Sequence, residues 1–166
     1  TELEMENPPE YIEGFDISNI QGRDSVASLV VFKGGTPSKQ DYRRFKIKTV
    51  EGPDDFASMQ EVIERRYSRL LKEDRKLPDL ILIDGGKGQL SAAYEILKKL
   101  GLKDQPVIGL AKKEEEIFKP EIDKSLKFDK NSDMVLFIRK MRDSVHNYVI
   151  NYNRKKRDMK NKKEMK

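Results

Sequence analysis

The chain has 166 residues, which is enough for one domain with a buried core and too few for two ordinary domains. It contains no cysteine, which excludes disulfides, zinc–thiolate sites and thiol nucleophiles and favours a reducing, cytoplasmic location. The net charge of +5, the 38% of charged residues and the lack of any apolar run of about eighteen residues predict a soluble protein with a slightly basic surface, no membrane partner and no signal peptide.

The first part of the chain predicts three strands in an antiparallel meander. Residues 11–18, 24–35 and 41–50 are short segments rich in β-branched and aromatic residues. A Gly-Gly-Thr-Pro sequence at 34–37 separates the second segment from the third, and a polar stretch around Gln21 separates the first from the second. Connections as short as these favour antiparallel neighbours.

A helix is expected next, from the Gly-Pro-Asp-Asp sequence at 52–55 to about Glu73. The acidic residues of its first turn complement the helix dipole. Its expected buried face consists of apolar residues at helical spacing, namely Phe56, Met59, Ile63, Tyr67 and either Leu70 or Leu71.

The second part of the chain predicts a strand, a helix, a strand, a small excursion and a final helix. Residues 78–84 are apolar at both alternating positions, as in a central strand buried on both faces. The helix that follows is expected to turn Leu90, Ala93, Tyr94 and Leu97 inward and to stop at Gly101. Residues 105–112 predict a short buried strand, residues 114–129 a hairpin or edge excursion, and residues 131–157 a long helix. The expected core positions of that last helix are Met134, Ile138, Met141, Val145, Val149 and Tyr152.

This order of elements is that of the RNase H-like α/β fold. A mixed sheet is expected, with the antiparallel meander followed by parallel strands that right-handed crossovers connect through flanking helices. The predicted domain covers residues 11–157, with an N-terminal extension at 1–10 and a basic C-terminal tail at 158–166.

The glycine-rich segment that begins at Asp84 is the first candidate site. A P-loop needs four residues between its glycine and the Gly-Lys pair and then Ser or Thr, and a dinucleotide fingerprint needs a third glycine where Ser91 stands, so neither motif fits. Asp84 ends a central strand, where open α/β sheets place their sites, and is expected to bind a divalent cation while Lys87 touches a phosphodiester. The alternative is an aspartate that caps the following helix.

Two further residues complete this candidate site. Asp16 interrupts an otherwise apolar first strand, which the fold places beside the strand ending at Asp84, so that both carboxylates can reach one ion. His146 lies one residue past the core position Val145 and shares its stripe of the helix with Arg142. It is a candidate metal ligand or proton carrier with an arginine nearby to hold phosphate, and the alternative is an ordinary surface or packed histidine.

Several segments occur in a characteristic order over roughly residues 11 to 157: FDISNIQG, VASLVVFKGG, YRRFKIK, GPDDFASMQEVIERRY, LPDLILIDGGKGQL, IGLAKKEEEIF and RDSVHNYVI. In order and spacing they resemble the C-terminal endonuclease domain of UvrC, the bacterial nucleotide excision repair nuclease. The block around Asp84 is highly specific to that family.

The resemblance implies hydrolysis of a phosphodiester on the 5′ side of a DNA lesion by two aspartates and a histidine. These match Asp16, Asp84 and His146, whereas Asp55 matches a further family acid or, equally, a simple helix-start acid. The resemblance also implies damaged DNA as substrate and the UvrB helicase as partner. The UvrB contact, the nuclease domain for the other incision and the helix-hairpin-helix elements belong to regions outside this chain.

We expect Asp16, Asp84 and His146 to hold one or two Mg²⁺ or Mn²⁺ ions that activate water and stabilise the leaving 3′ oxygen. Phosphate contacts are expected from basic residues that could equally be solvated surface charges, namely Lys87, Lys112, Arg43, Arg44 and Arg142. The rival function is a catalytically silent nucleic-acid binding or scaffolding module on the same fold. A binding module has no need to bury uncompensated acids, which argues against that rival. A third function, a nucleotide-binding NTPase, would need a phosphate-binding loop that the sequence does not contain.

Overall fold

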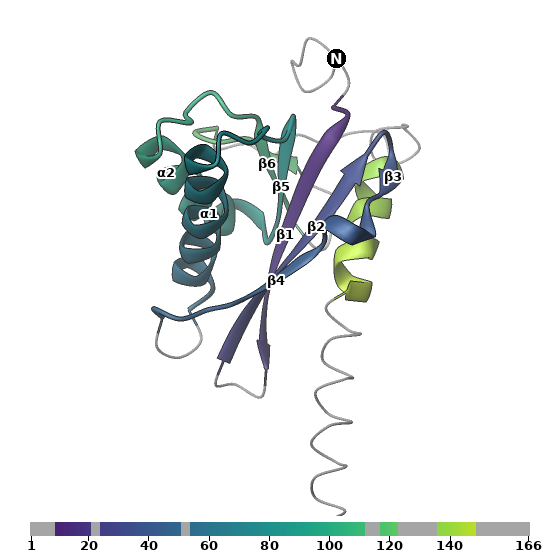
Figure 1. The fold of residues 1–166 in the computed structure, drawn as a ribbon. Coiled ribbons are helices and arrows are strands. Elements are labelled where there is room, and N and C mark those ends of the chain that lie inside the picture. The colour runs from purple at the N-terminus through teal and green to yellow at the C-terminus, as the bar shows by residue number, and fades with distance from the viewer. Residues whose placement is uncertain (1–8, 21–23, 51–53, 112–116, 123–135, 149–166) are drawn as a thin grey trace, which may run out of the picture.

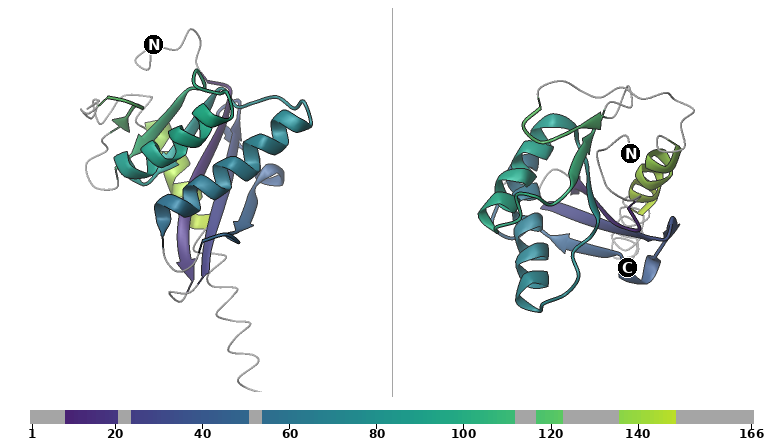
Figure 2. Two further views of the ribbon diagram at one scale, coloured as in Figure 1. Left: turned by 90° about the vertical axis from the view of Figure 1, so that its left-hand side faces the viewer. Right: turned by 90° about the horizontal axis from the view of Figure 1, so that it is seen from above.

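Helices cover both faces of one mixed sheet in the part of the chain that the structure describes (Figure 1). The computed structural model describes residues 9–20, 24–50, 54–111, 117–122 and 136–148. Seen from above, the sheet lies between a pair of helices on one side and the helical segment 136–148 on the other (Figure 2). None of the helices in these ranges is both long enough and apolar enough to span a bilayer.

The sheet confirms the predicted fold class. Its strands are β1 (Tyr11–Ile20), β2 (Asp24–Lys33), β3 (Thr36–Pro37), β4 (Arg43–Lys46), β5 (Leu80–Asp84), β6 (Val107–Leu110) and β7 (Ile117–Phe118). They lie in the order β3-β2-β1-β5-β6-β7, and β4 also pairs with β2. The pair β1–β2 is antiparallel, whereas β1–β5 and β5–β6 are parallel, as the RNase H-like order requires.

The meander contains a short extra strand that the sequence pattern did not predict. The chain turns back at Gly34 and Gly35, whose φ angles of 60° and 80° lie in the left-handed region that glycine tolerates. β3 then pairs with the end of β2, and a 3₁₀ helix at Lys39–Asp41 leads into β4. The third predicted strand, at 41–50, is confirmed over the shorter range of β4, whereas β3 lies in the predicted connection at 34–37. Both strands pair with β2.

Helix α1 (Asp55–Lys72) begins and packs as expected, except at its first turn. The Asp54 side chain accepts a hydrogen bond from the Ala57 amide at 3.0 Å and so caps the helix. The prediction that Phe56 faces the core is wrong, because its side chain is 55% exposed. Its ring lies over Gly88 instead, where a Cβ atom would come within 2.6 Å of the ring. The predicted positions Met59, Ile63, Tyr67 and Leu70 are buried, and Leu71 is exposed.

Helix α2 (Gly86–Lys99) ends where the sequence predicts. Gly101 has a φ angle of 80°, and its amide bonds to the Lys98 carbonyl while the Leu102 amide bonds to the Leu97 carbonyl. This pair of hydrogen bonds is a Schellman motif, in which a left-handed glycine stops the helix. Of the last predicted helix, the described residues 136–148 are helical. Its buried positions include Ile138, Met141 and Val145, while Met134, Val149 and Tyr152 lie outside the described residues.

Two apolar cores lie on opposite faces of the sheet. Phe15 and Ile83 belong to the core beneath α1 and α2, and Ile12 and Leu82 belong to the core beneath the segment 136–148. That segment approaches β1 closely at Gly14, where a Cβ atom would lie 3.3 Å from the nearest atom of Met141 and 3.6 Å from that of Val145. The last helix therefore packs beside the first strand, as the fold prediction required.

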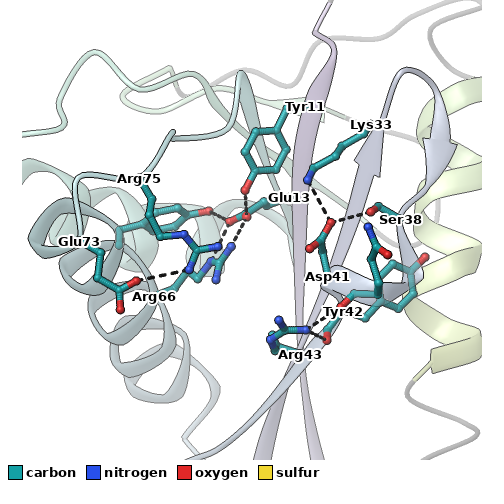
Figure 3. Close-up of polar contacts among 12 residues, drawn as sticks. Tyr11, Glu13, Lys33, Ser38, Asp41, Tyr42, Arg43, Arg66, Glu73 and Arg75 are labelled. Atoms are coloured by element: carbon teal, nitrogen blue, oxygen red, sulfur yellow. Dashed lines mark hydrogen bonds and ion pairs between the residues drawn. The ribbon is translucent and has the colours of Figure 1, made fainter.

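A buried glutamate fixes α1 against β1 (Figure 3). Glu13 is fully buried, and Arg66 donates to its two carboxylate oxygens at 3.2 and 2.6 Å. The Tyr67 hydroxyl donates to the same carboxylate at 2.8 Å, and the Tyr11 hydroxyl also donates to it. Burial, followed by the adjacent Glu13 charge, raises the pKa of Tyr67 well above its ordinary value. This network joins the second half of α1 to the central strand β1.

Candidate active site

Asp16 and Asp84 lie side by side on neighbouring parallel strands. The register of β1 and β5 pairs Phe15 with Ile83, so the two aspartates occupy the next step of the same pair of strands. Phe15 and Ile83 point into the core beneath α1 and α2. Because successive side chains alternate between faces, Asp16 and Asp84 point to the opposite face, toward the segment 136–148. The structure therefore brings the two acids together as the sequence predicted.

Both carboxylates are withdrawn from solvent. The exposed fraction is 6% for Asp16 and 2% for Asp84. Two acids at adjacent positions in a low-dielectric sheet concentrate negative charge, which favours a cation close to both. The helix-cap alternative for Asp84 is not supported, because the cap position of α2 is Gly85 and no side chain caps that helix.

His146 reaches this face of the sheet from the segment 136–148. Its Nε2 atom lies 3.4 Å from Asp84 Oδ2, and its side chain is 44% exposed. The helix turns Val145 and Met141 onto the sheet, so the next residue, His146, lies at the flank of the buried stripe and points along the sheet toward Asp84. One side of the imidazole thus meets the buried acid, while another part of it is open to solvent.

The donor set suits a hard divalent cation that keeps part of its water shell. Within the described residues, no three Asp, Glu or His side chains converge closely enough to hold a metal ion by themselves. Mg²⁺ commonly takes only one or two carboxylates in protein sites and completes its shell with water and substrate phosphate. Two adjacent buried carboxylates fit that requirement.

The chain passes from Asp84 directly into the first turn of α2 through a glycine-rich segment. Gly86 opens α2 with a φ angle of 78°, and Gly88 accommodates the Phe56 ring. Lys87 lies between these glycines on the first turn of α2 and is exposed. The positive end of the helix dipole and the lack of side chains both favour an anion at this place.

Asp55 lies at the start of α1, near the carboxyl end of β1. It is exposed, and the Asn19 side-chain amide donates to its carboxylate at 3.4 Å. Asn19 follows Asp16 by three residues on the same strand, so the side chain that contacts Asp55 points to the opposite face of the sheet from Asp16. Asp54 caps the helix, and Asp55 lies in its first turn, where an acid complements the helix dipole. Both the assisting role of Asp55 and the alternative of a helix-start acid stay predictions.

The basic residues proposed for phosphate contact differ in their surroundings. Arg43 is exposed and donates to the backbone carbonyls of Gln40 and Tyr42 at 2.9 and 2.8 Å (Figure 3). Arg44 donates to the Tyr148 carbonyl at 3.0 Å, and its guanidinium carbon lies 3.7 Å from the centre of the Tyr148 ring.

Two further basic residues were predicted to contact phosphate. Arg142 is half-buried one helical turn before His146, and Lys112 lies outside the described residues. Sequence reasoning missed Tyr148, whose contact with Arg44 joins residues 104 positions apart and so has no local signal.

The topology and the paired acids define the class of RNase H-like nuclease domains. The family model described as the UvrC RNase H endonuclease domain matches residues 1–150, and the chain belongs to that family.

Two relatives illustrate how similar the family members are. The chain is 54% identical over 165 residues to UvrABC system protein C of Porphyromonas gingivalis, covering 99% of this chain and 27% of that protein. It is 55% identical over 152 residues to UvrABC system protein C of Methanococcus maripaludis, covering 92% and 29% respectively. The chain thus spans less than a third of the length of these curated relatives.

Among solved structures, the chain is similar to Ciona intestinalis Endonuclease V in complex with a 24mer DNA containing an inosine. The TM-score is 0.44 at 18% identity, over 82% of this chain and 56% of that one. The catalytic domain of human Endonuclease V gives a TM-score of 0.42 at 22% identity, over 82% and 54%.

Proposed function

We propose that this domain hydrolyses a phosphodiester bond of damaged DNA on the 5′ side of the lesion during nucleotide excision repair. The observation that carries the proposal is the β1–β5 register, which sets Asp16 beside Asp84, with His146 Nε2 at 3.4 Å from Asp84. The domain acts in the cytoplasm as part of a longer protein. Regions outside this chain bind the UvrB helicase and most of the DNA.

Asp16 and Asp84 would hold Mg²⁺ or Mn²⁺ through their carboxylate oxygens. A bound ion supplies Lewis-acid stabilisation of charge on the phosphate and activates the attacking water. The two acids make that binding favourable because their charges are adjacent and buried. His146 carries no negative charge, so the site as a whole is less negative than one with a third carboxylate in its place.

In this proposal His146 binds the ion or moves a proton. Its Nε2 atom faces Asp84, and the exposed part of the ring leaves a route to solvent for a proton that the imidazole would carry.

The loop after Asp84 would receive the phosphate backbone. Its glycines let the substrate approach the main chain, and Lys87 extends from the first turn of α2 beside them. Arg142 lies one helical turn before His146, on the same side of the last helix, and can hold a neighbouring phosphate.

Incision of a lesion-containing duplex by the full-length protein with UvrB tests this function. Asp16→Asn and Asp84→Asn should each abolish 5′ incision, whereas 3′ incision continues and shows that the complex still assembles. Asp104→Asn removes an exposed acid of another loop and serves as the matched control. If Asp84→Asn cuts the 5′ side at the rate of the control, the domain is a binding module rather than the nuclease.

A further inference from the structure

The edge strand β4 contacts the helix that carries His146. Arg44 pairs with Ser28 across β4 and β2, and Ser28 pairs with Asp16 across β2 and β1. These three residues form one row across the sheet, and all three side chains point to the face that the segment 136–148 covers. Arg44 thus lies at one end of a row that begins at a candidate catalytic acid.

Arg44 makes two directional contacts with Tyr148. Its Nη2 donates to the Tyr148 carbonyl at 3.0 Å, and its guanidinium stacks over the Tyr148 ring at 3.7 Å. The Tyr148 ring also meets the Tyr42 ring edge to face, with centres 5.1 Å apart.

The contacts of Tyr148 fall two residues after His146. At a rise of about 1.5 Å per residue, Tyr148 is within about 3 Å of His146 along the helix axis. The buried Met141 and Val145 hold the helix against β1, but apolar contacts are non-directional and permit it to rotate or slide. The planar guanidinium of Arg44 fixes the rotation, because stacking and hydrogen bonding together specify one orientation.

We propose that Arg44 is a positioning residue that sets His146 against Asp84 for the reaction. The inference rests on the proposed function of this site. It assigns Arg44 to the helix contact in place of the phosphate contact expected from the sequence. The two roles predict opposite effects on DNA affinity and on turnover.

Kinetics of 5′ incision and DNA binding by the full-length protein separate these roles. Arg44→Leu should lower kcat by about 10²-fold, the loss expected when a catalytic group is displaced by about 1 Å, with KM and DNA affinity unchanged. Arg44→Lys keeps the charge but loses the planar stack, so it should restore little activity. Lys46→Leu removes an exposed basic side chain of the same strand that has no assigned phosphate contact, and is the matched control.

Tyr148 variants test the contact itself. Tyr148→Leu removes the ring stack but keeps the backbone carbonyl that accepts from Arg44, so it should lower kcat by less than Arg44→Leu does. The double variant should be no worse than Arg44→Leu alone, because Arg44→Leu already removes both contacts. Tyr148→Phe keeps the ring and the backbone carbonyl and should behave as wild type. Additive losses in the double variant would contradict the proposal.

Hydrogen exchange gives a readout that does not depend on activity. Amides of residues 136–148 should exchange faster in Arg44→Leu, whereas those of β5 keep their protection. If instead Arg44→Leu weakens DNA binding, reduces its salt slope by about 0.9 and leaves both kcat and exchange unchanged, Arg44 contacts phosphate and the proposal fails. Incision by Asp84→Asn would refute the proposed function separately, and the exchange data would still decide whether Arg44 holds the helix.

Discussion

Replacement of Glu13 by glutamine should unfold the domain at much lower denaturant than wild type. Each carboxylate oxygen of Glu13 accepts one hydrogen bond from Arg66 and one from a tyrosine hydroxyl. A glutamine amide must place its NH₂ group against one of these pairs. The tyrosine hydroxyl can reverse and accept, but the arginine N–H cannot.

The loss is therefore one charge-assisted hydrogen bond and the counter-charge of Arg66, whose side chain is only 11% exposed. Hydrogen bonds to charged groups contribute about 1.5–3 kcal/mol, and breaking a buried ion pair costs about 3–5 kcal/mol. We expect a loss of about 3 kcal/mol in the free energy of unfolding, with a Tm lower by roughly 6–12 °C for a domain of this size.

Urea unfolding followed by circular dichroism measures this loss. Glu73→Gln is the matched control, because Glu73 pairs with Arg69 at 2.9 Å on the exposed side of the same helix, and solvent screens that pair. The control should change the urea midpoint little. A Glu13→Gln midpoint as high as that of the control would refute the view that this network fixes α1 to β1.

Two further perturbations probe the loop before α1 and the packing of the last helix. Burial would raise the pKa of Glu61, but hydrogen bonds, above all from Thr49, outweigh burial and lower that pKa. The ionised Glu61 therefore stabilises the fold above its ordinary pKa of 4.5, and this stabilisation is lost as pH falls through the pKa of the folded state. Glu61→Gln should therefore flatten the acid side of the curve of Tm against pH, and parallel curves would contradict this. Gly14→Val places methyl groups where a Cβ atom alone would already lie 3.3 Å from Met141, so it should cost about 1–3 kcal/mol and lower kcat of incision, with Gly14→Ala much milder. Turnover by Gly14→Val equal to that of Gly14→Ala would show that the helix position does not matter to the site.

The pairing of Asp16 with Asp84 could be predicted because each aspartate interrupts or ends an apolar strand segment that is visible in the sequence. An aspartate at the end of an apolar segment and another within the first strand are visible in the sequence, and the fold order places those strands side by side. The same pattern could not distinguish Asp16 from Glu13, which is also an acid in that strand. The two acids lie three residues apart and so point to opposite faces of the sheet. Only the packed structure shows that Glu13 meets Arg66 on one face and that Asp16 lies beside Asp84 on the other.

The remaining errors and gaps have a common cause in long-range packing. Helical spacing counts Phe56 as a core position, but the first turn of α1 lies beside α2, so the ring covers Gly88. Arg44 and Arg43 look alike as basic residues of one strand, yet alternation turns only Arg44 toward the last helix. Such contacts depend on which elements meet in space, and sequence periodicity carries no information about that.

Anomalous diffraction from crystals of the domain grown with Mn²⁺ tests the central claim most directly. The account predicts an anomalous peak between Asp16 and Asp84, in contact with one oxygen of each carboxylate, and no peak there in Asp84→Asn. A fully occupied Mn²⁺ elsewhere on the molecule, with the space between the two aspartates empty at saturating metal, would contradict a metal-dependent nuclease site at this place.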